Sequence, residues 1–257
     1  MSVDHSSKLS LLLERLARAY PDIQPTPTPQ WGQPMIDEGE PMLSEFVRSM
    51  LLWESTTAKA EAALKRIQTG VVDFNELRVC LPGELVGLMG ETYPLARERA
   101  ERLRAALNEI FTRGHAVTLK HLAELGKREV LHYLESLSGV PQFVAARVAL
   151  LFLGNHAMPV DSRILRVLLE AQAVAPGETQ DSAASMLEHR IRAGELMIAY
   201  LHLQARADEL GAAEQGPSGN GVKAAAASEE RPKRTIRGGR SANVKPGATP
   251  PKRAADA

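Results

Sequence analysis

The sequence lacks a second cysteine and any long apolar run. Its one cysteine, Cys80, allows no intrachain disulfide and no cysteine-ligated zinc or iron–sulfur cluster, and it suits a reducing compartment. The longest apolar stretch, VALLFLG, is far shorter than the roughly 20 residues that span a bilayer. The first residues, MSVDHSSKLS, contain no cationic segment followed by an apolar run. We therefore expect a soluble cytoplasmic protein with no membrane partner.

Charges of the two signs balance over the 257 residues, but they are unevenly distributed. Residues 212–257 carry nine Lys and Arg against four Asp and Glu, a net charge of +5, which leaves −5 on residues 1–211. This tail has few large apolar residues and is rich in Gly, Pro, Ala and Ser, which predicts disorder. Its RPKRTIRGGR stretch is typical of basic arms that add phosphate contacts, and equally of a solubilising tail without a partner.

The rest of the chain predicts one helix after another, with no alternating β-branched runs and no repeat of fixed period. We expect an all-α protein of about ten helices, divided into an N-terminal helix with a Pro-rich segment (1–40), a helical body (41–211) and the basic tail (212–257). The expected helices are 7–19, 41–55, 56–70, 73–80, 82–90, 94–114, 117–125, 127–137, 141–154, 161–173, 181–191 and 193–210.

The stretch SGVP, within residues 126–154, forms a short connection between two apolar helical segments. Gly139 permits a positive φ or a close backbone approach, and Pro141 suits the first position of the second helix. Free amides at that helix N-terminus favour an anion such as phosphate. A plain turn between two packed helices explains the same residues.

The segment LESLSGVPQFVAARVALLFLGNHAMPVDSRILRVL resembles the helix-hairpin-helix and catalytic loop of the endonuclease III-like DNA glycosylase superfamily. The resemblance rests on Leu137 to Phe143, and then on Val160, Asp161 and Arg166. Upstream, MLLWESTTAKAEAALKRI and YPLARERAERLRAALNEI resemble earlier helices of the same family, in the right order over about residues 40–205. The resemblance implies the helix-hairpin-helix glycosylase fold and DNA base excision repair.

Asp161 matches the family's catalytic carboxylate, which stabilises positive charge on the sugar while the N-glycosidic bond breaks. It is also a favoured N-cap for the helix SRILRVLLE, and the two roles are compatible. Phe143 stands where bifunctional members carry a nucleophilic lysine, so the resemblance implies a monofunctional enzyme in which water attacks. Arg147, one turn further on, stays protonated and cannot replace that lysine.

Several positions depart from the family's pattern. Pro141 replaces a glycine and removes one amide from the phosphate-binding turn. The family's glutamine wedge falls near Ser55, which is small for the task, while Trp53 is either an intercalating residue or a buried one. Residues 190–211 contain no cysteine, so we expect no iron–sulfur cluster. The resemblance implies DNA contacts at Gly139, Val140, Pro141, Gln142, Phe143 and Ser55.

No side chains suggest a metal site, and His115, His121 and His132 share no zinc-like spacing with carboxylates. The resemblance allows a monovalent cation at the backbone carbonyls of Glu135, Leu137 and Val140. No other cofactor is expected.

We keep three hypotheses open. The first is a monomeric, monofunctional glycosylase acting on double-stranded DNA, at the nucleoid if the protein is bacterial. The second is a catalytically inactive DNA-binding or scaffolding relative, and the third is an all-α protein unrelated to DNA. An active enzyme predicts Asp161 at the mouth of a cleft that faces residues 138–143, whereas a buried Asp161 favours the inactive relative.

Overall fold

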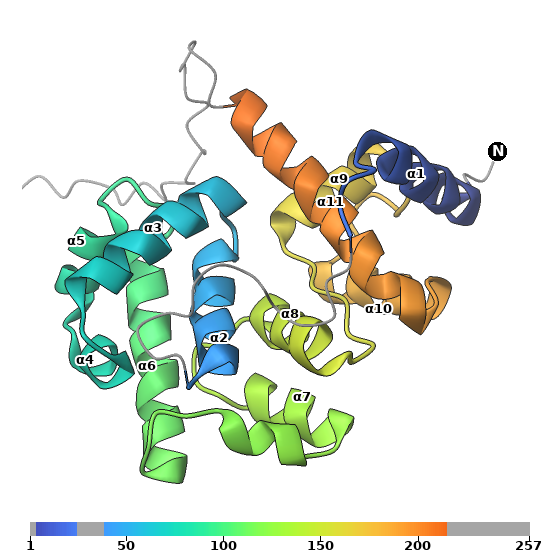
Figure 1. Cartoon of the computed structure of the whole chain (residues 1–257). Helices are drawn as coiled ribbons and strands as arrows, with labels where there is room; N and C mark the ends of the chain where they lie inside the picture. The colour runs from blue at the N-terminus through green and yellow to red at the C-terminus, as the bar shows by residue number, and fades with distance from the viewer. Residues whose placement is uncertain (1–3, 25–38, 215–257) are drawn as a thin grey trace, which may run out of the picture. The chain divides into compact units, whose positions relative to one another are not determined.

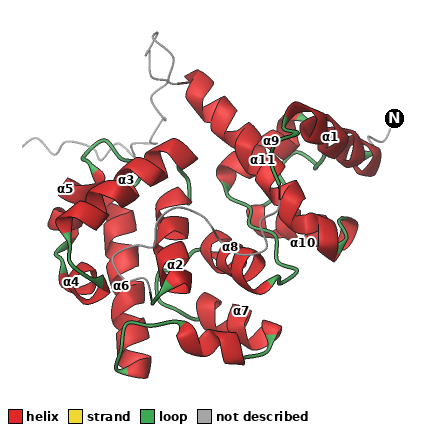
Figure 2. Cartoon of the chain, viewed as in Figure 1, coloured by secondary structure: helices red, strands yellow, loops and turns green. Residues whose placement is uncertain are grey.

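A computed structural model describes residues 4–24 and 39–214, which all fall in one compact unit. Most of the Pro-rich segment and the predicted disordered tail beyond residue 214 lie outside the described residues. The described part is helical, with no strand, as predicted (Figure 2). Its elements are α1 (His5–Ala19), α2 (Pro41–Leu52), α3 (Thr57–Gly70), α4 (Phe74–Val79), α5 (Pro82–Met89), α6 (Ala96–Gly114), a 3-10 turn (Lys120–Glu124), α7 (Lys127–Glu135), α8 (Gln142–Leu153), α9 (Ser162–Glu170), α10 (Gln180–Arg190) and α11 (Ala193–Glu214).

Local sequence accounts for most helix starts. The side chains of Thr56, Asp73, Asp161 and Thr179 each accept an amide of the first turn of α3, α4, α9 and α10, respectively. Such a cap stabilises a helix by about 1 kcal/mol. Asp161 is the cap predicted for α9.

Helices α2 and α8 pack against each other between two groups of helices (Figure 1). On one side, α6 contacts α5, α4 and α2, and α3 contacts α2 and α5. On the other side, α9 contacts α10 and α11, and α11 contacts the N-terminal helix α1. None of the described helices is long and apolar enough to cross a membrane.

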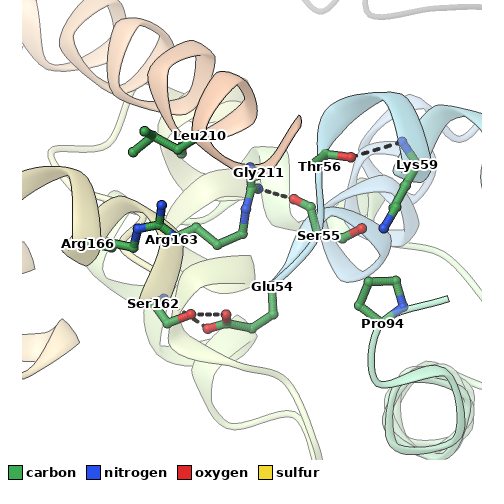
Figure 3. Close-up of a pocket in the computed structure, with 11 residues that line it drawn as sticks. Glu54, Ser55, Thr56, Lys59, Pro94, Ser162, Arg163, Arg166, Leu210 and Gly211 are labelled. Carbon is green, nitrogen blue, oxygen red and sulfur yellow. Dashed lines mark hydrogen bonds between the residues drawn. The ribbon is translucent and has the colours of Figure 1, made fainter. Parts of the chain in front are cut away.

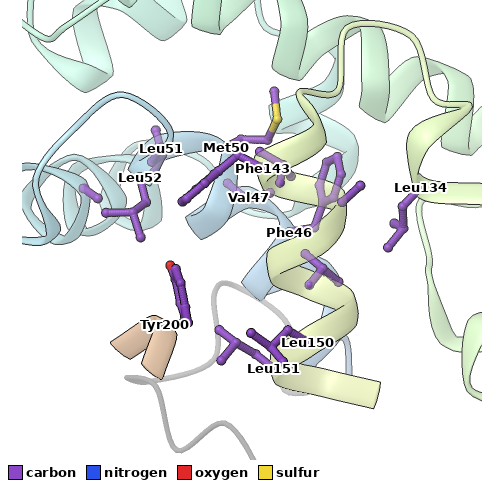
Figure 4. Packing of buried hydrophobic residues seen from close by; sticks show 14 of the residues in the cluster. Phe46, Val47, Met50, Leu51, Leu52, Leu134, Phe143, Leu150, Leu151 and Tyr200 are labelled. Carbon is purple, nitrogen blue, oxygen red and sulfur yellow. The ribbon is translucent and has the colours of Figure 1, made fainter. Parts of the chain in front are cut away.

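The interface between α2 and α8 is part of the apolar core. Phe46, Val47 and Met50 of α2 are buried together with Phe143 and Leu150 of α8 (Figure 4). A charged cluster lies inside this apolar layer, because Arg147 of α8 is paired with Glu45 of α2 although both side chains are at most 4% exposed. The core therefore ties the second helix of the predicted hairpin rigidly to α2.

Several predicted helix ends differ from the observed ones by up to four residues, and three of the differences have a local cause. Helix α6 begins at Ala96 and not at Pro94, because Leu95 takes a left-handed conformation (φ 51°) that no regular helix contains. The predicted helix 117–125 is only the 3-10 turn Lys120–Glu124, and its buried residues Val117, Leu119 and Leu122 do not follow helical spacing. Helix α8 begins at Gln142, one residue later than predicted, because Pro141 takes an extended backbone and serves as the N-cap.

Candidate functional site

Asp161 is held at the start of α9 by two backbone hydrogen bonds. Its Oδ1 accepts the amide of Ile164 at 2.9 Å, and its Oδ2 accepts the amide of Glu54 at 3.1 Å. The side chain is 0% exposed. This burial raises the pKa of Asp161 to about 6, and the negative charge of Glu54 acts in the same direction. Asp161 therefore does not lie at the mouth of a cleft, because the connection between α2 and α3 covers it.

Asp161 accepts the backbone amide of Glu54, and the Glu54 side chain in turn contacts the residue that follows Asp161. The Glu54 carboxylate accepts the Ser162 amide at 2.9 Å and also the Ser162 hydroxyl, and Gln180 Nε2 donates to it at 3.4 Å. Glu54 has a left-handed backbone (φ 52°), which costs a non-glycine residue roughly 1–2 kcal/mol. The hydrogen bond from its amide to Asp161 helps to hold that conformation, so the two acidic residues form one interlocked unit.

A cavity of about 220 Å³ opens beside this pair, where the two groups of helices meet (Figure 3). Glu54 is half-buried in its wall, and Asp161 is not among the lining residues. The cavity is lined by Glu54, Ser55, Thr56, Lys59, Pro94, Ser162, Arg163, Arg166, Ala207, Leu210 and Gly211. These residues come from the α2–α3 connection, the start of α3, the start of α9 and the end of α11, with Pro94 from the segment before α6.

Arg163 fastens three of these segments together. It donates to the Ser55 carbonyl and forms an ion pair with Asp208 of α11 at 2.8 Å. Asp208 in turn accepts the Thr57 amide at 3.1 Å, at the start of α3. Because both partners are mostly buried, this pair fixes the geometry of the cavity wall rather than providing a mobile charge.

Arg99 holds the end of α2, where the α2–α3 connection begins. It is fully buried and donates to the carbonyls of Met50 and Trp53 at the end of α2, where a cation opposes the negative end of the helix dipole. Burial lowers the pKa of Arg99 to about 10. Trp53 lies against the guanidinium groups of both Arg99 and Arg102, at 5.5 and 5.1 Å. Trp53 is therefore half-buried and packed against two guanidinium groups in this conformation, and an intercalating role for it stays a prediction.

Phe143 belongs to the core. Its side chain is 2% exposed and makes a tilted edge contact with the Tyr200 ring at 6.5 Å. Arg147, on the same helix, donates to Glu45, Ser49 and Tyr200. The Phe143 side chain cannot stack on a base in this conformation, and Arg147 is fully engaged by buried partners.

The predicted hairpin is formed by α7, the turn at 136–141 and α8. Gly139 has φ +78°, and a Cβ there would lie 3.1 Å from the Cα of Arg102 in α6. Both reasons predicted for a glycine at this position are therefore present. Arg102 also donates to the Gly139 carbonyl at 3.3 Å, so the turn is pressed against α6.

Three backbone amides of the hairpin, those of Gly139, Gln142 and Phe143, make no hydrogen bond within residues 4–24 and 39–214. The Val140 amide is used within the turn, since it donates to the Leu137 carbonyl at 3.2 Å. Pro141 has no amide to offer. The hairpin thus keeps unused donors at the N-terminus of α8, where an anion is favoured.

An ion pair on α6, between Glu109 and Arg113, holds the other side of the turn. The carboxylate of Glu109 accepts the Ser138 amide at 2.5 Å, and hydrogen bonds from Ser138 lower the pKa of Glu109 to about 2. Arg113 pairs with Glu109 and donates to the Ser136 carbonyl at 2.9 Å. These contacts pin the turn to α6 independently of any ligand.

The cation expected at the carbonyls of Glu135, Leu137 and Val140 stays a prediction, and the Leu137 carbonyl already accepts an amide. In the described part of the chain, no three His, Cys, Asp or Glu side chains are arranged to hold a metal ion.

The structure places Asp161 next to the α2–α3 connection that contains Ser55, but it leaves the hairpin outside the cavity that Ser55 lines. Ser55 is 2% exposed and lines the cavity, so it does not project as a wedge. None of Gly139, Val140, Pro141 or Gln142 lines the cavity. Sequence reasoning missed Glu54, which lies between the two positions weighed as a wedge. Its importance depends on a contact with Asp161, 107 residues away, for which the sequence gives no local signal.

The hairpin pressed against α6 and the helix α9 capped by a buried aspartate lie within an all-α body whose fold is similar to that of solved DNA glycosylase structures. Among solved structures, a trapped endonuclease III–DNA covalent intermediate matches 79% of this chain and 85% of its own, with a TM-score of 0.59 at 16% identity. A thermostable thymine-DNA glycosylase matches 78% and 86%, with a TM-score of 0.52 at 16% identity. The 8-oxoguanine glycosylase/lyase of Clostridium acetobutylicum, in complex with double-stranded DNA, matches 81% and 70%, with a TM-score of 0.58 at 15% identity.

No family model matches the sequence, and no curated protein matches it significantly. At 15–16% identity, the structural similarity establishes the fold that was expected from the resemblance, and the chemistry is argued from the site itself.

Proposed function

We propose that this protein is a monofunctional DNA glycosylase, which binds double-stranded DNA as a monomer and hydrolyses the N-glycosidic bond of a damaged or mismatched base. We further propose that it acts in the cytoplasm, at the nucleoid if the protein is bacterial. The observation that carries the proposal is the interlocked pair of Asp161 and Glu54 beside a cavity of about 220 Å³, in a fold shared with DNA glycosylases. A fixed carboxylate beside a cavity is what a reaction with an oxocarbenium-like transition state requires.

The residues of α8 support hydrolysis without strand cleavage. A Schiff base needs an amine that attacks the sugar, and Phe143 offers only a buried phenyl ring at the matching position. Arg147 is held by Glu45 and Tyr200 and remains a cation. Water is therefore the proposed nucleophile.

The unused amides of Gly139, Gln142 and Phe143 support a phosphate contact at the hairpin. Such a contact requires no lysine, which suits a body of net charge −5. The tail of residues 212–257, with its net charge of +5, supplies cations for non-specific affinity in this proposal.

The burial of Asp161 favours a second candidate, an inactive relative that binds or organises DNA. In that case Asp161 would be retained as a helix cap, a role that is worth about 0.5–2 kcal/mol of stability. Duplex binding without base release from any substrate would favour this candidate over the first.

A panel of labelled duplexes tests the proposal. Each duplex carries one lesion of a different kind, namely an alkylated purine, an oxidised pyrimidine, uracil or a mismatch, and base release is measured after alkaline cleavage of abasic sites. We expect release from at least one duplex by the wild type, and much less by Asp161→Asn. Equal, background-level release by both proteins on every duplex would overturn the enzyme proposal.

A parallel binding measurement tests the role of the tail. Duplex affinity is measured at several salt concentrations for the full chain and for a chain ending at residue 214. We expect the shorter chain to bind more weakly and with a shallower salt dependence, because each neutralised phosphate contributes about −0.9 to the slope of log K against log salt.

A further inference from the structure

The cavity is lined by one acidic side chain, and it is not the one expected from the sequence. Among the eleven lining residues, Glu54 is the single acid, whereas Asp161 is fully buried behind it. We infer that Glu54 is the catalytic carboxylate that faces the sugar of a nucleotide in this cavity, and that Asp161 is its positioning residue. The inference rests on the proposed function and names the residue that performs it.

The contacts of Glu54 hold a carboxylate in one orientation while leaving it able to react. Ser162 donates from both its amide and its hydroxyl, and Gln180 donates at 3.4 Å, which uses three of about four acceptor sites of a carboxylate. The remaining site is available to a water molecule in the cavity. Figure 3 shows the paired contact between Glu54 and Ser162 at the cavity wall.

Asp161 acts on Glu54 through the backbone. The left-handed conformation of Glu54 directs its side chain along the start of α9, and the Glu54 amide is fixed by Asp161 Oδ2 at 3.1 Å. Backbone strain of this kind persists where surrounding contacts enforce it, and it is frequent at functional sites. Asp161 enforces it here, which gives the buried aspartate a purpose beyond capping α9.

A second feature of the cavity points to a polar ligand. The Ser55 hydroxyl is buried beside the Tyr93 hydroxyl, which itself donates to the Leu51 carbonyl at 2.6 Å. Ser55 therefore keeps acceptor capacity that a donor atom bound in the cavity would use.

The proposed step uses only water as a second reactant. The water oxygen forms a bond to the sugar C1′ while the bond from C1′ to the base nitrogen breaks, and that electron pair leaves with the base. The water gives its proton to the Glu54 carboxylate, which passes it to the departing base through solvent. During the step, the negative charge of Glu54 stabilises the positive charge that develops on the sugar.

A binding experiment that needs no catalysis tests whether the negative charge of Glu54 faces the sugar. Two duplexes carry an abasic analogue at the same position, either a cationic pyrrolidine or a neutral tetrahydrofuran, and Kd is measured by fluorescence anisotropy. We expect the wild type to bind the cationic analogue about tenfold more tightly than the neutral one. Glu54→Gln should abolish this preference while still binding the neutral duplex.

Two further variants sharpen the comparison. Glu178→Gln is a matched control, because Glu178 is also a half-buried glutamate that accepts a serine hydroxyl, from Ser182, but does not line the cavity. It should keep the full preference. Asp161→Asn should reduce the preference and leave affinity for the neutral duplex unchanged, whereas a purely structural role would weaken both.

Different outcomes would contradict the role of Glu54 and the proposed glycosylase function. A preference that survives in Glu54→Gln and disappears in Asp161→Asn would overturn this inference and leave the proposed function standing, with Asp161 as the facing carboxylate. Equal binding of both duplexes by the wild type, or no binding of either, would overturn the proposed function as well. Circular dichroism of each variant confirms that it is folded before the comparison is made.

Discussion

Gly139 lies so close to Arg102 that a methyl group on Gly139 would come within 3.1 Å of the Arg102 Cα atom. The hairpin and α6 therefore meet backbone to backbone, with the Arg102 side chain folding over to the Gly139 carbonyl at 3.3 Å. Only glycine satisfies both this contact and the φ of +78°.

We predict that Gly139→Ala lowers the free energy of unfolding by about 2–4 kcal/mol, from left-handed strain plus the contact with the α6 backbone. Gly154→Ala is the matched control, since Gly154 is also left-handed (φ +58°) but has open space around it. That variant should lose only about 1–2 kcal/mol. Urea unfolding measures both, and equal losses would contradict a special role for the contact with α6.

The stability of the protein should depend on pH through Asp161. Its pKa rises from 3.8 to about 6 on folding, chiefly because of burial. Glu54, Arg163, Tyr200 and Arg99 are the charged or titratable groups coupled to it. A raised carboxyl pKa means that the folded state binds the proton more tightly than the unfolded state, so this contribution is complete below about pH 4 and is lost as pH rises through 6.

We therefore predict that the wild type loses stability relative to Asp161→Asn between pH 4 and pH 7, by at most about 3 kcal/mol. The asparagine keeps an oxygen for the Ile164 amide and does not titrate. Urea unfolding of both proteins at four pH values measures the difference. A difference that stays constant with pH would show that Asp161 has an ordinary pKa.

Sequence reasoning identifies the parts of this structure that local patterns determine. The cap at Asp161, the glycine at position 139 and the helical body all follow from residue types and spacing within one or two turns of helix. The start of α6 does not, because Leu95 adopts a left-handed backbone that leucine rarely takes and that only its surroundings enforce.

The candidate site depends even more on contacts that local sequence patterns do not reveal. The sequence identifies Asp161 as a candidate catalytic residue. Whether its side chain is exposed depends on a contact with Glu54, which is 107 residues away in the chain. The pairing of Glu45 with Arg147 joins residues 102 apart in the same manner. Periodicity identifies which face of a helix is buried, and it carries no information on which charges meet there.

The buried pair of Glu45 and Arg147 should be far more costly to break than to replace. Their side chains are 3% and 4% exposed, the Ser49 and Tyr200 hydroxyls accept from the Arg147 guanidinium, and Ser49 donates to Glu45. We predict that Glu45→Gln destabilises the protein by about 3–5 kcal/mol, because the Arg147 cation loses its counter-charge in the core.

The double variant Glu45→Leu with Arg147→Met should recover most of that loss, since well-packed apolar residues of similar volume often replace a buried ion pair without cost. A double-mutant cycle in urea measures the coupling between the two positions. Losses that simply add, with no recovery in the double variant, would mean that the pair is not energetically coupled.

Pro141 limits the hydrogen bonds that the hairpin can offer to a phosphate. The amides of Gly139, Gln142 and Phe143 are unused, and Pro141 interrupts the run with a residue that has none. Its φ of −66° and ψ of 147° are accessible to glycine, so Pro141→Gly adds an amide without requiring a new backbone conformation.

If the hairpin binds a phosphate as proposed, Pro141→Gly should tighten duplex binding by about tenfold, the effect expected of one added hydrogen bond to a charged group. The same change should lower the free energy of unfolding by about 0.5–1 kcal/mol, because glycine gives the unfolded chain more freedom. Pro176→Gly, at an exposed position between α9 and α10, should produce a loss of stability of the same kind without the gain in affinity. Unchanged affinity in a folded Pro141→Gly variant, measured by anisotropy at fixed salt, would argue that DNA reaches the protein elsewhere than at this turn.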